Sequence, residues 1–152
     1  MSWSEPDDER WGEGDNDRWE PDPGWEAEPS GRWPLDWRGL YPRERWIWFE
    51  QLWSDACMLR ERYRLALRAG WWEDQIQVEA LAAFAAWVHL YDRGEWTDPP
   101  GKLALLYDLE RLAELLRDGA DPFHPDRDRV AFARHLLELG CQPPPARAPE
   151  PP

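Results

Sequence analysis

Apolar side chains recur at intervals of three and four residues from about residue 42 to residue 140, which is the spacing of one face of an α-helix. Proline or glycine marks most ends of these apolar runs, as expected where helices begin and stop. No segment shows the two-residue alternation of a strand. The pattern therefore predicts an all-α protein with four helices.

The first two predicted helices cover residues 42–70 and 71–94, and each ends at a glycine. The alanines between residues 80 and 86 permit close contact with another helix. The expected inward face of the first helix comprises Trp46, Phe49, Trp53, Ala56, Tyr63 and Ala66, with Arg60 as its polar interruption. That of the second comprises Ile76, Ala80, Leu81, Phe84, Trp87, Val88 and Tyr91.

The other two predicted helices cover residues 98–119 and 125–140. Asp98 is a good cap for the third helix, and Pro99 and Pro125 suit a first helical turn. The expected inward face of the third helix comprises Leu103, Leu106, Leu109, Leu112 and Leu116. That of the fourth comprises Val130, Ala133, Leu136 and Leu137.

Four helices with short connections predict a small four-helix bundle over residues 39–140, and a chain of 152 residues is enough for one such domain. The first helix would be ~40 Å long at 1.5 Å per residue, which allows a homodimer through it. Residues 141–152 are rich in proline, and we expect an extended tail there.

Residues 1–38 differ from the rest in composition and charge. They hold 12 acidic residues against four arginines, which is −8 of the chain's net charge of −13. Proline and glycine interrupt any helix or strand, and Leu35 is the only large aliphatic residue, so we expect a disordered tail. The negative charge argues against direct binding to nucleic acid or to an anionic membrane, because both repel an acidic surface.

The acidic segment nevertheless carries tryptophans at positions 3, 11, 19, 25 and 33, three of which follow an arginine. Their separations are all even, so the indoles of an extended chain would project to one side. Tryptophan gives a large contact area at a low cost in rotamer entropy. We interpret Trp11, Trp19, Trp25 and Trp33 as anchors for a partner protein. The alternative is that this tail wraps onto its own bundle. We expect Trp37, at the junction between the tail and the bundle, to pack on the bundle.

Candidate chemistry is sparse. Two cysteines, Cys57 and Cys141, make no disulfide framework, and three histidines are scattered, so we expect no metal site and no cofactor. The tripeptide His124-Pro125-Asp126 matches the signature of J-domains. In that family it follows a basic helix directly, whereas here residues 119–122 break a leucine-rich helix. We therefore expect the proline to begin the fourth helix.

No catalytic motif assembles, so the leading hypothesis is a non-enzymatic accessory or regulatory protein that binds a partner protein through its tail and helical domain. The alternative is a DNA mimic that inhibits a nucleic-acid-binding protein, its carboxylates imitating phosphates. The acidic start is the reverse of a signal peptide and no apolar run reaches the length of a membrane span, so we expect a cytoplasmic protein.

The second predicted helix begins with paired tryptophans, and Glu-Ala follows with apolar spacing to another tryptophan. The third predicted helix ends near a glycine, and Pro-Phe comes after it. The matching positions are Trp71, Trp72, Glu79, Ala80, Trp87, Trp96, Gly119, Pro122 and Phe123. At these positions, residues 45–123 resemble an actinobacterial domain family of unknown function that is often carried on plasmids and integrative elements. The family often has a cysteine before its paired tryptophans, where this chain has Ala69-Gly70. The resemblance implies a helical domain and a mobile-element context, and it supplies no catalytic residues.

Overall fold

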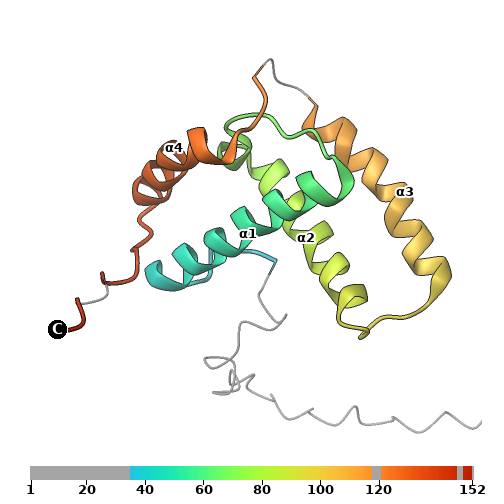
Figure 1. Cartoon of the computed structure of the whole chain (residues 1–152), viewed down its shortest axis with the longest axis horizontal. Helices are drawn as coiled ribbons and strands as arrows, with labels where there is room; N and C mark the ends of the chain where they lie inside the picture. Colours follow the sequence, from blue (N-terminus) through green and yellow to red (C-terminus); the bar gives the residue numbers. More distant parts are fainter. Residues whose placement is uncertain (1–34, 118–120, 147–148, 152) are drawn as a thin grey trace, which may run out of the picture.

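The computed structural model describes residues 35–117, 121–146 and 149–151. These residues form α1 (Pro42–Tyr63), the short 3₁₀ helix η2 (Trp71–Glu73), α2 (Gln75–Asp92), α3 (Pro99–Leu116) and α4 (Pro125–Glu138) (Figure 1). The described part of the chain contains no strand, so the predicted all-α fold of four packed helices is confirmed. Residues 1–34 lie outside the description.

The helices are arranged in the spatial order α4, α1, α2, α3. Helix α1 packs against α2 on one side and against α4 on the other, while α3 packs mainly against α2 (Figure 1). The apolar side of α1 is therefore used within the fold, and the homodimer through this helix stays a prediction. Helix α3 has one main helical neighbour, and several of its large apolar side chains are exposed.

Helix α1 ends at Tyr63, seven residues before the predicted end. Arg64 adopts a left-handed conformation with φ of 53°, and the chain then runs extended. Leu65 and Leu67 are buried while Ala66 is exposed, which is an alternation of period two. The predicted inward position of Ala66 is therefore wrong, because the helical period stops before it.

The extended connection after α1 pairs with the connection before α4. Arg68 and Pro122 form an antiparallel bridge. The backbone N–H of Ala69 donates to the carbonyl of Asp121 at 2.8 Å, and that of Phe123 donates to the carbonyl of Leu67 at 2.9 Å. Two loops far apart in the sequence are thereby tied together.

Helix α2 begins at Gln75 rather than at the predicted residue 71. The Asp74 carboxylate caps it by accepting from the backbone N–H groups of Ile76 (3.0 Å) and Gln77 (3.3 Å). Ile76, predicted to face inward, is 64 % exposed because it lies in this first turn, away from α1 and η2. The apolar residues of α2 that are buried are Val78, Leu81, Phe84, Ala85 and Val88.

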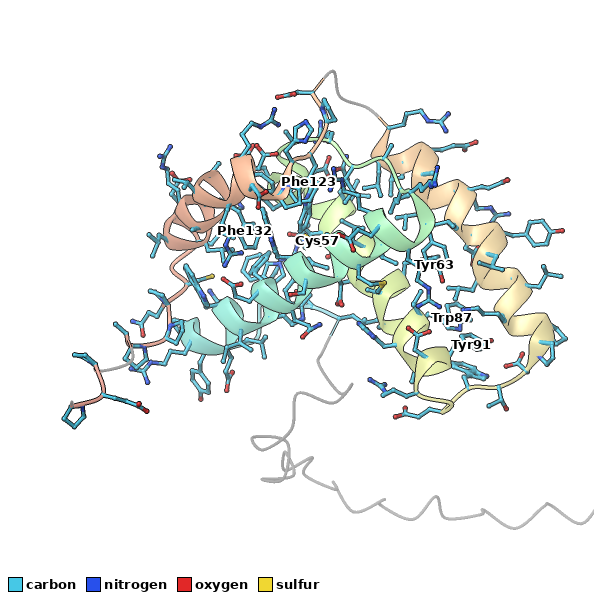
Figure 2. The ribbon with its side chains drawn as sticks, viewed as in Figure 1. Cys57, Tyr63, Trp87, Tyr91, Phe123 and Phe132 are labelled. Atoms are coloured by element: carbon cyan, nitrogen blue, oxygen red, sulfur yellow. The ribbon has the colours of Figure 1, made fainter. Side chains whose placement is uncertain are left out.

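Aromatic rings fill the core between α1, η2 and α4. The Trp53 ring lies 4.5 Å from Phe132 and 5.0 Å from Phe123 between centroids, and it also contacts Trp71 and Trp72 of η2. Phe123 and Phe132 come from the α4 side of the molecule (Figure 2). We call these five residues the aromatic cluster; all are buried.

Two predicted inward faces are right only in part: Leu112 and Leu116 of α3 and Leu136 of α4 are buried, but other predicted positions are not. On α4, Val130 and Leu137 are exposed, whereas Phe132 and Leu136 are fully buried, because the aromatic cluster draws Phe132 inward. On α3, Leu103 and Leu106 are exposed, because this helix packs mainly against α2 and they lie away from that contact. The buried stripe of α3 is Leu105, Leu112 and Leu116.

Trp37 packs on the start of α1, as predicted. Its ring centroid lies 5.2 Å from that of Phe49, and the guanidinium of Arg45 lies 5.5 Å from the indole. The same guanidinium donates to the carbonyls of Leu40 (2.7 Å) and Arg38 (2.8 Å). The segment that leads into α1 is thus fixed onto the fold.

Pro125 begins α4, as predicted, and His124 is the N-cap residue. The Asp128 carboxylate accepts from the backbone N–H of His124 at 2.9 Å and from Nε of Arg127 at 2.8 Å. The hydrogen bond from Arg127, supported by the one from His124, holds the pKa of Asp128 below its usual value. Asp128 therefore stabilises the fold in its ionised form.

We expect Phe132→Ala to lower the free energy of unfolding by about 3–5 kcal/mol, because it removes a fully buried ring and leaves a cavity. Val130→Ala on the same helix is the control; since Val130 is 67 % exposed, it should change the value by less than about 0.5 kcal/mol. Urea denaturation measures both. Equal effects of the two substitutions would contradict the assigned register of α4.

The lowered pKa of Asp128 predicts a contribution to stability that is present at neutral pH and lost as the pH falls through that pKa. Asp128→Asn should therefore lose stability relative to wild type above about pH 4, and the difference should shrink toward about pH 2. Urea denaturation across this pH range measures it. Asp126→Asn, an exposed neighbour in the same turn, is the control and should change the free energy of unfolding at pH 7 by less than about 0.5 kcal/mol.

Candidate functional site

An open groove of about 330 Å³ lies between α2 and α3. We call it the α2–α3 groove. It is lined by Ala80, Ala83, Phe84 and Trp87 of α2 and by Leu105, Asp108, Arg111, Leu112 and Leu115 of α3. Seven of these nine side chains are apolar, so the groove suits an apolar side chain better than a polar one.

The groove exists because small side chains of α2 face large ones of α3. Ala80 and Ala83 leave space beside α2, while the buried Phe84, Leu105 and Leu112 form the floor. Small residues at such positions let another backbone or a bulky side chain approach closely. The sequence signal for this site was the alanine-rich stretch of the second predicted helix.

The edge of the groove carries two charged side chains and one exposed apolar one. Nη1 of Arg111 lies 3.8 Å from Oδ1 of Asp108, and the Arg111 side chain is 85 % exposed. Leu115, one helical turn further along α3, is 42 % exposed. The edge therefore offers a cation, an anion and an apolar contact to a ligand.

A stack of aromatic rings extends the groove at Trp87. The ring centroid of Trp96 lies 5.7 Å from that of Trp87 and 6.4 Å from that of Tyr91, with interplanar angles of 25° and 15°. Trp87 and Tyr91 lie at the end of α2 that neighbours the start of α3 (Figure 2). Trp96, in the loop between the two helices, is 47 % exposed. The stack thus continues the apolar surface beyond the groove.

The hydroxyl of Tyr91 anchors this stack to α3. It donates to Oδ1 of Asp98 at 3.2 Å, and burial together with the Asp98 charge raises the pKa of Tyr91. Gly101, in the first turn of α3, permits this approach, because a Cβ there would collide with the Tyr91 hydroxyl and the Asp98 carboxylate. The loop and the first turn of α3 are therefore built around Tyr91.

Exposed hydrophobic side chains concentrate on the same part of the molecule. Eleven large hydrophobic residues are exposed in the described part of the chain, and five of them fall between residues 96 and 115. The five are Trp96, Leu103, Leu106, Tyr107 and Leu115. Of the five, Leu115 lines the groove, while the others lie elsewhere on α3 and on the loop that leads into it.

The anchors predicted from the sequence, Trp11, Trp19, Trp25 and Trp33, lie outside the described residues. The α2–α3 groove was not predictable from the apolar pattern, which places exposed leucines of α3 such as Leu103 and Leu106 in the core.

A histidine and an aspartate, which are 34 residues apart in the sequence, meet between α1 and α2. Nε2 of His89 on α2 lies 2.7 Å from Oδ1 of Asp55 on α1, and Nε2 of Gln51 donates to the same oxygen at 3.1 Å. Asp55 is buried, so these bonds satisfy a carboxylate inside the α1–α2 contact. Within the described ranges, no group of three or more His, Cys, Asp or Glu residues is placed to hold a metal ion.

Both cysteines are free thiols, Cys57 half-buried on α1 and Cys141 buried after α4. Burial raises the pKa of each thiol, which favours the protonated, less reactive form.

Comparison of the chain with protein-family models, with curated proteins and with solved structures gives no match. In the described part of the chain, none of the helices has the length and apolar character needed to cross a membrane.

We expect Asp55→Ala to lower the free energy of unfolding by about 1–3 kcal/mol, because His89 and Gln51 lose a buried hydrogen-bond acceptor. Glu61→Ala on the exposed side of the same helix is the control and should cost less than about 0.5 kcal/mol. Urea denaturation at pH 7 measures both. An Asp55 variant as stable as the Glu61 variant would show that the carboxylate does not join the two helices.

Proposed function

We propose that this chain is a non-enzymatic accessory or regulatory protein that binds a partner protein through its helical domain and its acidic, tryptophan-bearing N-terminal segment. The observation that carries the proposal is the α2–α3 groove, whose lining is mostly apolar and includes the exposed Leu115 of α3. Burial of apolar surface is the dominant favourable term in most protein–protein association. A surface of this kind gains free energy when a partner covers it.

The shape of the groove favours an amphipathic helix of the partner as its ligand. The stretch from Ala80 to Trp87 is ~10 Å long, which is about two helical turns. The two alanines allow a helix backbone to approach, and apolar side chains spaced three or four residues apart would enter the groove. Arg111 and Asp108 at the edge would contact polar residues that flank this apolar stripe.

The N-terminal segment adds a second set of contacts in this proposal. Trp11, Trp19, Trp25 and Trp33 would serve as anchors on the partner, since tryptophan is enriched among residues that dominate binding energy. The surrounding acidic residues keep the segment soluble and favour a partner with basic side chains. A mobile-element context, implied by the resemblance of residues 45–123, remains part of the proposal.

The DNA-mimic alternative has less support from the described residues. Many of their carboxylates pair with arginine, as in Arg62–Asp92 at 2.7 Å, Arg127–Asp128 at 2.8 Å and Arg93–Glu95 at 3.0 Å. Paired carboxylates present a weaker negative field than a row of phosphates does. Mimicry would therefore rest on the N-terminal segment.

We expect Leu115→Arg to reduce capture of the partner from a lysate of the native host by at least about tenfold, because a charge replaces an apolar contact of the groove. Leu137→Arg is the matched control: this leucine is exposed on α4, away from the groove, and capture should equal that of wild type. Quantitative mass spectrometry of the captured proteins measures the ratio. A partner held equally by both variants would contradict the proposed site.

Replacing the four tryptophans at 11, 19, 25 and 33 by alanine should weaken the same capture, and the wild-type complex should withstand a high-salt wash. Apolar burial is not screened by salt, whereas a phosphate-like contact is. A complex with a nucleic-acid-binding protein that salt releases would instead favour the DNA mimic.

A further inference from the structure

We infer that this chain forms a two-fold symmetric homodimer through the outer side of α3, with Leu106 at the dimer axis. The two α3 helices run antiparallel in this dimer. The contact is separate from the α2–α3 groove and from the dimer through α1 that the sequence allows. It therefore goes beyond the proposed function and does not depend on it.

Three large apolar side chains are exposed near the start of α3. Leu103 is 54 % exposed, Leu106 is 39 % exposed and Tyr107 is 66 % exposed. Residues three and four apart are neighbours on a helix surface, so the three side chains adjoin. Helix α3 is the outermost of the packed helices, and its far side faces away from the fold (Figure 1). Covering these side chains would remove apolar area from water, which is favourable.

One cation and one anion flank this apolar patch. Lys102 and Glu110 each lie four residues from Leu106, so the three side chains form one row along the helix. The Lys102 ammonium lies 5.3 Å from the centre of the Tyr91 ring, and Glu110 is exposed. In the described part of the chain neither charge forms an ion pair. Each is therefore available to an opposite charge on another molecule.

A two-fold axis at Leu106 brings the two charges together. Lys102 and Glu110 lie ~6 Å from Leu106 along α3, in opposite directions. In an antiparallel pair, Lys102 of one copy stands level with Glu110 of the other, and the symmetry repeats this contact. Helices most commonly pack with such four-residue rows aligned. A parallel pair would set like charges against each other, so the charges favour a second copy in the antiparallel orientation.

The α2–α3 groove stays open in this dimer. Leu115, which lines the groove, follows Leu106 by nine residues, which is about two and a half helical turns. The two leucines therefore lie on opposite sides of α3. One chain can hold a second copy and a groove ligand at the same time.

Sedimentation equilibrium of the full chain tests the dimer. The apolar patch is small, so we expect a weak dimer that forms as the protein concentration rises toward about 1 mM. Leu106→Arg should weaken association at least about tenfold, because like charges then meet at the axis. Leu137→Arg is the matched control; this leucine is 56 % exposed on α4, and association should equal that of wild type. A monomer at every concentration, or equal association of the two variants, would overturn the inference.

Charge reversal tests the two ion pairs. Lys102→Glu leaves only acidic groups in this row and Glu110→Lys leaves only basic ones, so each variant alone should associate at least about fivefold more weakly than wild type. An equimolar mixture of the two variants should restore association, because acidic groups then meet basic ones across the axis. Damage to the fold would not be repaired by mixing. A mixture that associates no better than either variant alone would overturn the inference.

Zero-length crosslinking tests the orientation. Lys102 is the only lysine of the chain, and a carbodiimide joins its amine to a carboxylate in contact with it. Lys102 and Glu110 of one chain lie ~12 Å apart along α3, which is too far for such a bond. In a mixture of ¹⁴N and ¹⁵N chains, we expect mass spectrometry to show a bond from Lys102 of one chain to Glu110 of another. Bonds between chains at other positions only, or none between chains, would overturn the inference.

Discussion

The packing of Trp53 against the tryptophans of η2 and the phenylalanines near α4 is the contact on which the rest of the fold depends. Trp53 projects from the middle of α1, so the chain must leave that helix and return to place Trp71 and Trp72 beside it. This requirement explains the left-handed Arg64, the extended connection and its bridge to Pro122. The guanidinium of Arg129 closes the cluster, 5.1 Å from the Trp53 ring, and pairs with Glu50.

The aromatic cluster also determines where the protein exposes apolar surface. It joins α1, η2 and α4 and leaves α3 outside, so α3 is attached through α2 and through the loop built around Tyr91. A helix with many leucines and one helical neighbour cannot bury them all. The α2–α3 groove and the exposed leucines of α3 thus follow from a core assembled elsewhere.

Sequence periodicity located the four helices and most of the inward faces of α1 and α2, where Phe49, Trp53 and Leu81 are buried. The starts at Pro42, Pro99 and Pro125 were predictable, because proline suits a first helical turn and little else in a helix. The inward faces of α3 and α4 were predictable only in part, because these two helices carry apolar residues on more than one side. Contacts with the other helices determine that Phe132 is buried and Val130 exposed. The α2–α3 groove likewise depends on how α3 packs against α2.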